Sequence, residues 1–220
     1  MSKNKNNTIC IIPARQNSKR IKNKNLLKIN GKTLTEISIV LAKKSKLFKE
    51  IILSSDSKKI INLGKKLKIM AIKRDKALSQ DNTTTDDVIK NLISNINFEY
   101  ENIILLQVTS PLRKISTLKK FYSHCLNKKL SSCLSVSLIN DNLSKKDNFF
   151  NSVNDNIRNS QNRKPFIYEN GLLYFFKKKE FLKKNKIYPK KNWPYFITDK
   201  YESLDINELQ DYKIAKKIYN

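Results

Sequence analysis

The hydrophobic positions of the chain follow two alternating patterns. Short apolar runs are separated by longer stretches in which apolar residues recur at helical spacing, as do Leu34, Ile37 and Leu41. This alternation predicts an α/β fold, with a mostly parallel sheet flanked by helices. The predicted strands are 8–13, 50–54, 69–72, 103–108 and 132–138. The predicted helices are 34–44, 58–67, 85–96 and 116–127.

The alternation stops after about residue 139. Segment 139–163 is rich in Asn, Asp, Ser and Lys, which indicates an excursion from the sheet, or an arm. Strand-like residues resume at 166–176, and the stretch 207–218 predicts a C-terminal helix. We find no internal repeat and no clear linker, so we expect residues 1–220 to form a single domain.

The charge balance is strongly basic. Lys and Arg number 45 against 19 Asp and Glu, which gives a formal net charge of +26. Such a charge favours nucleic acid or an anionic surface as partner. Lys far outnumbers Arg, however, as an A/T-rich codon bias would produce, and no nucleic-acid motif is present. The three glycines, at 31, 64 and 171, exclude both G-x-G-x-x-G and the P-loop motif.

The cysteines and the N-terminal sequence favour a cytoplasmic protein. Three cysteines lie in apolar surroundings without metal-like spacing, and there is one histidine, which excludes a Cys/His zinc site. The polar start leads directly into a short apolar run, unlike a signal peptide. No stretch reaches the roughly 18 apolar residues of a membrane span. We therefore expect no membrane partner.

Polar segments follow two of the predicted strands at their carboxyl ends, where sheets of this kind bind ligands. Segment 14–26 contains five cationic side chains and suits a triphosphate, although a solvated basic turn is the simpler interpretation. Arg15 and Arg20 favour the phosphate site, because Arg is scarce in this chain. Gln107 and Arg113 follow the most apolar run, and we expect them at the rim of the same site.

Two later segments carry further candidate groups. Asn170-Gly171, between strand-like residues, is by default a hairpin turn. Asp205 and Asn207 alternate along a short extended stretch, so both could face a divalent cation such as Mg²⁺. The simpler alternative makes Asn207 the N-cap of the last helix and Asp205 a surface acid.

Taken together, four ordered segments resemble the acylneuraminate cytidylyltransferases, also called CMP-sialic acid synthetases. Residues 12–26 read I-P-A-R-Q-N-S-K-R-I-K-N-K-N-L and match the family's phosphate loop. Residues 105–113 read L-L-Q-V-T-S-P-L-R, 170–174 read N-G-L-L-Y and 203–207 read S-L-D-I-N. The resemblance covers nearly the whole chain. It implies a Rossmann-like nucleotide-diphospho-sugar transferase fold with a small arm, residues 139–163, that serves dimerisation.

The resemblance also implies a reaction and residue roles. CTP and a nine-carbon 2-keto sugar acid would give a CMP-sugar and pyrophosphate, with Mg²⁺ as cofactor and a homodimer as assembly. The implied catalytic residues are Arg15, Lys24 and Asp205. The implied substrate-binding residues are Ser18, Lys19, Asn25, Arg74, Gln107, Lys145 and Asn170. The implied metal ligands are Asp205 and Asn207. Such a reaction needs charge neutralisation and in-line positioning more than covalent help.

Three departures from the family pattern leave the sugar open. Asn207 stands where the family has a second metal-binding Asp. The family's R-Q-[DE]-L reads S-Q-N-R at 160–163, which displaces the sugar-binding Arg to Arg158 or Arg163 if it is kept. Residues 141–143 replace the family's histidine segment. Sialic, legionaminic and pseudaminic acids therefore remain alternatives, as does a Kdo-type or other sugar nucleotidyltransferase. A basic nucleic-acid-binding module is the alternative from another class.

Overall fold

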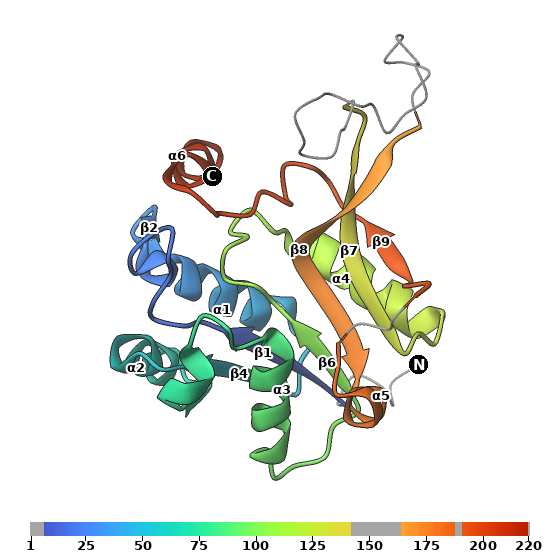
Figure 1. Cartoon of the computed structure of the whole chain (residues 1–220), viewed down its shortest axis with the longest axis horizontal. Helices are drawn as coiled ribbons and strands as arrows, with labels where there is room; N and C mark the ends of the chain where they lie inside the picture. The colour runs from blue at the N-terminus through green and yellow to red at the C-terminus, as the bar shows by residue number, and fades with distance from the viewer. Residues whose placement is uncertain (1–6, 142–163, 188–190, 220) are drawn as a thin grey trace.

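The computed structural model describes residues 7–141, 164–187 and 191–219, and its main feature is a seven-stranded sheet (Figure 1). In spatial order the strands are β5 (Met70–Lys73), β4 (Glu50–Ser55), β1 (Thr8–Pro13), β6 (Asn102–Leu105), β8 (Phe166–Lys177), β7 (Ser132–Ile139) and β9 (Tyr195–Ile197). Within this sheet β8 runs antiparallel to its neighbours β6 and β7, and the other described pairs of the sheet are parallel. The predicted mostly parallel sheet is confirmed.

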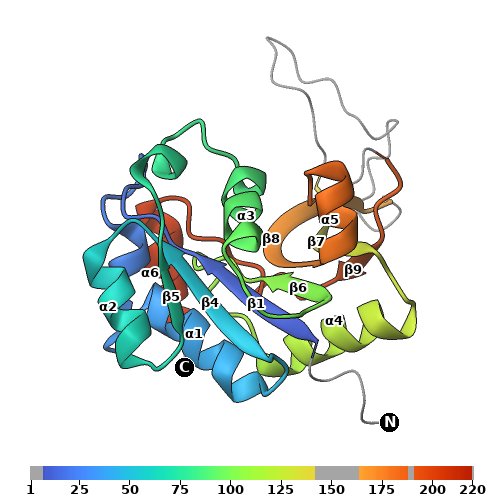
Figure 2. The same ribbon diagram turned by 90° about the horizontal axis from the view of Figure 1, so that it is seen from below.

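Helices cover both faces of this sheet (Figure 2). One face carries α1 (Leu34–Ser45), α2 (Lys58–Lys66) and α4 (Ile115–Asn127). The opposite face carries α3 (Thr85–Ser94) and α5 (Lys178–Lys184). The last helix, α6 (Leu209–Ile218), packs beside a small hairpin of β2 (Lys28–Ile29) and β3 (Lys32–Thr33), where Tyr212 Oη donates to the Lys28 carbonyl at 2.6 Å.

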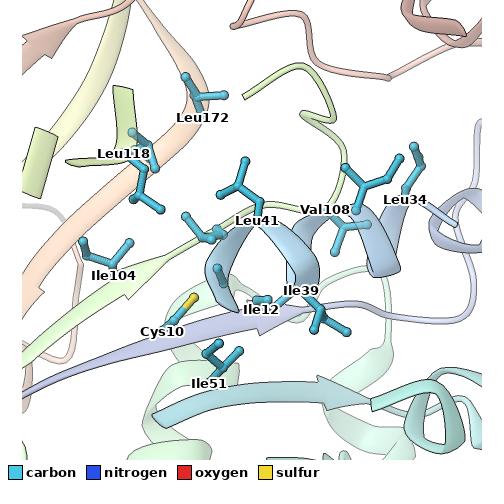
Figure 3. Close-up of a cluster of buried hydrophobic side chains, with 14 of the residues drawn as sticks. Cys10, Ile12, Leu34, Ile39, Leu41, Ile51, Ile104, Val108, Leu118 and Leu172 are labelled. Atoms are coloured by element: carbon cyan, nitrogen blue, oxygen red, sulfur yellow. The ribbon is translucent and has the colours of Figure 1, made fainter. Parts of the chain in front are cut away.

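Burial on both faces explains why the central strands are apolar throughout. In β1, Cys10 and Ile12 face the core under α1 and α4, whereas Ile9 and Ile11 face the core under α3. All four side chains are fully buried. Figure 3 shows Cys10 and Ile12 within the first of these cores. A strand buried on both sides has no polar alternation, as the sequence of β1 shows.

The structure corrects two local predictions. Helix α4 begins at Ile115, with Lys114 as N-cap, one residue earlier than predicted. Asn170 and Gly171 form no hairpin turn but lie inside β8, in a bulged stretch of that strand where the register against β7 shifts between the pairs Leu134–Tyr174 and Val136–Glu169. Gly171 has a φ of +72°, a left-handed conformation that a side chain would strain. The bulge re-aims the strand at this point.

The structure also bears on the cysteines and on membrane-spanning helices. All three cysteines are buried free thiols. No helix in the described part of the chain is both long and apolar enough to cross a membrane. The predicted arm lies, beyond residue 141, outside the described residues.

Candidate active site

A cavity of about 610 Å³ opens at the carboxyl ends of β1 and β6. Three loops, which follow β1, β5 and β6, and the 205–207 stretch surround it, and they come from distant parts of the sequence. Its polar and charged walls include Arg15, Ser18, Lys19, Arg20, Lys24, Asn25, Arg74, Asp81, Gln107, Asp205 and Asn207. Nine of the predicted site residues are thus brought together in one place, because parallel strands direct their carboxyl ends to the same edge.

The loop after β1 is held in shape by hydrogen bonds within the loop and to neighbouring elements. Asn25 Nδ2 donates to the Arg15 carbonyl at 2.8 Å, and the Gln16 amide donates to Asp56 Oδ1 at 2.7 Å. Thr35 Oγ1 in α1 donates to the Asn25 carbonyl at 2.8 Å. Asn25 is buried and closes the loop, so that the loop cations surround the cavity without any glycine-rich turn.

Two of these cations are paired with an acid from across the cavity. Arg15 Nη1 lies 3.3 Å from Asp81 Oδ1, and Lys19 Nζ lies 3.2 Å from Asp81 Oδ2. Asp81 belongs to the segment between β5 and α3 and was not among the predicted site residues. Its carboxylate thus occupies a position between two cations that were predicted to bind phosphate.

Lys24 differs from the other loop cations because it is buried. Its Nζ donates to the Ile206 carbonyl at 2.8 Å. Burial lowers the pKa of Lys24 below its ordinary value of 10.5, although nearby Asp205 acts in the opposite direction. The ammonium therefore joins the phosphate loop to the stretch that carries Asp205.

Arg74 is buried on another wall of the cavity. Its Nε donates to Ser54 Oγ at 3.2 Å and its Nη2 donates to the Ser54 carbonyl at 3.2 Å. Burial lowers its pKa to about 10, with Asp56 opposing the shift. A buried guanidinium with remaining donors suits the carbonyl and phosphate oxygens of a nucleotide.

A second cavity of about 460 Å³ adjoins the first and shares with it Gln107, Asp205 and Asn207. Gln107 Nε2 donates to Tyr174 Oη at 3.3 Å, and Tyr174 Oη donates to Glu169 Oε1 at 2.6 Å. The two cavities together offer room for two substrates that meet beside Asp205. Glu169 was not predicted, because its relation to Gln107 arises only from the bulged strand.

The buried side chains of Asn170 and Arg113 connect the segments around the second cavity through hydrogen bonds. Asn170 is buried, and its side-chain amide contacts four hydroxyl groups, those of Ser135, Ser137, Thr198 and Ser203. Arg113 is buried rather than at the rim, where we expected it; its Nε donates to the Leu172 carbonyl and its Nη2 to the Gln107 carbonyl. Both residues therefore fix the backbone that presents Gln107.

The predicted metal ligands meet at the junction of the two cavities. Asp205 Oδ2 accepts a hydrogen bond from Asn207 Nδ2 at 2.9 Å, whereas Asp205 Oδ1 is buried with no hydrogen-bond partner among the described residues. No group of three or more His, Cys, Asp or Glu side chains that could hold a metal occurs among those residues. The N-cap of α6 is Glu208, in a capping box with Asp211, so Asn207 is not the helix cap. Lys145 lies outside the described residues.

The architecture and the polar cavity at the strand ends define a nucleotide-binding α/β protein. Residues 9–218 match the family model described as cytidylyltransferase, and the chain belongs to that family. It is 29% identical over 213 residues to an N-acylneuraminate cytidylyltransferase of Streptococcus agalactiae serotype III, with 93% of this chain and 51% of the relative covered. The chain thus spans about half the length of that relative.

Other relatives match over nearly their whole length. The chain is 29% identical over 224 residues to a pseudaminic acid cytidylyltransferase of Campylobacter jejuni, with 96% of this chain and 95% of the relative covered. Among solved structures, CMP:2-keto-3-deoxy-manno-octonic acid synthetase complexed with CTP superimposes with a TM-score of 0.72 at 13% identity, over 96% of this chain and 98% of the other. That likeness shows the fold alone.

Proposed function

We propose that the chain transfers the CMP group of CTP to a nonulosonic acid and releases pyrophosphate. The observation that carries the proposal is the joined pair of cavities, with loop cations on one side and, at the junction, the half-buried Asp205 with one buried carboxylate oxygen. The family match and the printed activities of the relatives support the same reaction. The sialic, pseudaminic and legionaminic types all occur among those relatives, so the sugar stays open among these three.

In this proposal the larger cavity holds CTP. Arg15, Lys19 and Lys24 face the triphosphate, whose charge they offset through charge-assisted hydrogen bonds. Ser18 adds a hydroxyl donor, and Arg74 and Gln107 lie where the base or ribose would be held. These cations also stabilise the charge that builds up on the leaving pyrophosphate.

The smaller cavity takes the sugar acid beside Gln107. The anomeric hydroxyl attacks the α-phosphorus, and a new oxygen–phosphorus bond forms as the bond to the β-phosphate oxygen breaks. Pyrophosphate leaves with that electron pair, and the hydroxyl proton is released to solvent. Holding both substrates in line accounts for a large part of the acceleration in such a reaction. Lys145 remains the predicted partner of the sugar carboxylate.

Asp205 Oδ1, which has no hydrogen-bond partner among the described residues, is a suitable ligand for a magnesium ion. A buried carboxylate oxygen without a partner is a hard anionic ligand, and magnesium commonly takes one or two carboxylates and completes its shell with water and phosphate oxygens. When bound, the ion would neutralise charge on the transferred phosphate. Asp205 would hold it. Magnesium dependence and a homodimer are part of this proposal.

The experiment that tests the proposal is a pyrophosphate-release assay with four nucleoside triphosphates and a panel of sugar acids. We expect release with CTP and one nonulosonic acid, and little with ATP. Pyrophosphate release with GTP and a different sugar would instead indicate that the chain is another class of sugar nucleotidyltransferase. Absence of release with every pair, by protein that is folded, would contradict the proposal.

A further inference from the structure

Three side chains from two distant segments form one row at the junction of the cavities. Arg20 Nη2 donates to Asn207 Oδ1 at 2.6 Å, and Asn207 Nδ2 donates to Asp205 Oδ2 at 2.9 Å. The chemistry of the partners fixes the orientation of the amide: a guanidinium only donates and a carboxylate only accepts. Both the Oδ1 and the Nδ2 of the Asn207 side chain are therefore engaged in hydrogen bonds.

This arrangement is unfavourable for a metal ligand at Asn207. Its single side-chain oxygen already accepts a charged hydrogen bond, and a divalent cation bound there would have to replace a guanidinium of the same sign. Asp205 keeps one oxygen without a partner among the described residues, on a side chain whose other oxygen is held by Asn207. The row thus orients Asp205 and leaves one carboxylate oxygen for a cation.

The same row fixes Arg20 relative to Asp205. The loop is joined to the 205–207 stretch at a second point, where Lys24 Nζ donates to the Ile206 carbonyl at 2.8 Å. Arg20 is exposed and lines the larger cavity, and the guanidinium has five donors in a planar fork that matches phosphate oxygens. One hydrogen bond holds the guanidinium itself, and the second holds the loop that carries it beside the larger cavity.

We infer that Arg20 binds the triphosphate and that Asn207 positions Arg20 and Asp205 instead of binding the metal. The inference rests on the proposed function, because it takes CTP as the occupant of the larger cavity. Arg20 supplies a fixed positive charge at the place where Asn207 offers no carboxylate for a second cation. Arg20 is then a binding residue, and Asn207 is a positioning residue that acts through its two neighbours.

The test measures binding of the α,β-methylene analogue of CTP by calorimetry, first in excess EDTA. Arg20→Ala should weaken this metal-free binding about tenfold or more, the usual loss for a charged hydrogen bond. Lys22→Ala is the matched control, because Lys22 is exposed in the same loop and lies outside the lining of the cavity. Asn207→Ala should weaken binding by a smaller factor, and the double variant should bind no more weakly than Arg20→Ala.

A second measurement follows the affinity for Mn²⁺ by electron paramagnetic resonance at saturating analogue. Asp205→Asn should lower that affinity strongly, whereas Asn207→Ala, which removes only the group that orients the carboxylate, should lower it by a much smaller factor, since the carboxylate supplies the ligand. A loss in Asn207→Ala as large as in Asp205→Asn would make Asn207 a metal ligand and overturn the inference. Unchanged analogue binding in Arg20→Ala, or additive effects of the two variants, would overturn it as well.

The outcomes separate this inference from the proposed function. Failure of the folded wild type to bind the analogue would overturn both. Normal binding by the wild type and Lys22→Ala would support the cavity as the nucleotide site. The Arg20 and Asn207 variants would then decide the inference alone.

Discussion

The ammonium of Lys24 and the carbonyl oxygen of Ile206 lie 2.8 Å apart, although 182 residues separate them in the sequence. This bond joins the loop after the first strand to the stretch that carries Asp205. A cation that is buried and shared between two walls of a cavity sets the distance between those walls. Lys24 therefore acts on the geometry of the site as well as on its charge.

The buried position of Lys24 predicts an alkaline limit on nucleotide binding. Burial lowers its pKa, so the side chain loses its charge at a lower pH than an exposed lysine. Because the charged form binds phosphate better, CTP affinity should fall as the pH rises through that lowered pKa. In Lys24→Arg the fall should move to higher pH, since the guanidinium keeps its charge.

Calorimetric titrations of CTP between pH 7 and pH 11 would check this prediction. Lys28→Arg is a suitable control, because Lys28 is exposed and outside the cavity lining. The assignment to Lys24 would be wrong if both variants kept the pH profile of the wild type.

A second prediction concerns the buried guanidinium of Arg74. Ser54→Ala removes the Oγ that accepts from Arg74 Nε and leaves the backbone bond in place. We expect the KM for CTP to rise about two- to tenfold with a smaller change in kcat, the usual cost of one hydrogen bond.

The adjacent Ser55→Ala is the matched control, because Ser55 is equally buried but its Oγ accepts from the Ser57 amide instead. Steady-state kinetics of all three proteins would decide the role of Ser54. Equal KM values for the two serine variants would show that Arg74 does not need Ser54 to bind the nucleotide.

Most of the sheet could be predicted, because its strands and helices have the simple patterns that burial imposes. Strand β1 was predicted to the residue, and the predictions for β4 and α1 each ended one residue short of the structure. Strand β9 and helix α5 were not predicted. The first has three residues, and the second is Lys-rich with one buried side chain, so neither has a pattern long enough to detect.

The site could be predicted in part for the same reason. Arg15 and Gln107 follow apolar strands directly, and the topology of a parallel sheet brings such positions together. The partners of Asn170 could not be foreseen, because four hydroxyls from β7 and the 198–203 segment meet only in the folded chain. Asp81 carried one available signal, as an acid that follows a strand in a chain with few acids.

Asn170 yields a prediction about stability. Its buried amide satisfies four hydroxyls and the Leu172 amide, so Asn170→Leu leaves several buried polar groups without partners. We expect the free energy of unfolding to fall by about 2–4 kcal/mol. Urea unfolding would measure it, with Asn127→Leu, at an exposed position, as the control. A loss no larger than that of the control would show that the network contributes little.

The free oxygen of Asp205 predicts a large effect on turnover. Asp205→Asn keeps the shape of the side chain but removes the anionic ligand, and we expect turnover to fall on the order of 100-fold or more at any magnesium concentration. Glu208→Gln removes a carboxylate from the same segment at an exposed position outside the cavity lining, and should change turnover little. Pyrophosphate release over a magnesium titration would test both variants. Full activity of Asp205→Asn would refute the metal site.

The last prediction follows from Asp81, whose carboxylate contacts Arg15 and Lys19 at 3.3 Å and 3.2 Å. A triphosphate bound by the same two cations has to displace this carboxylate. The acid therefore competes with the nucleotide, and Asp81→Asn should bind CTP more tightly than the wild type. Both ion pairs are partly exposed to solvent, so the expected gain is modest, about two- to tenfold.

Calorimetry at low and high salt would measure this gain, which should shrink as salt screens the pairs. Asp75→Asn is the matched control, because it removes the same charge from the same segment at an exposed position outside the cavity lining. If both variants gained equally, the effect would come from net charge alone. If Asp81→Asn bound CTP more weakly, Asp81 would instead be holding Arg15 and Lys19 in the conformation that binds phosphate.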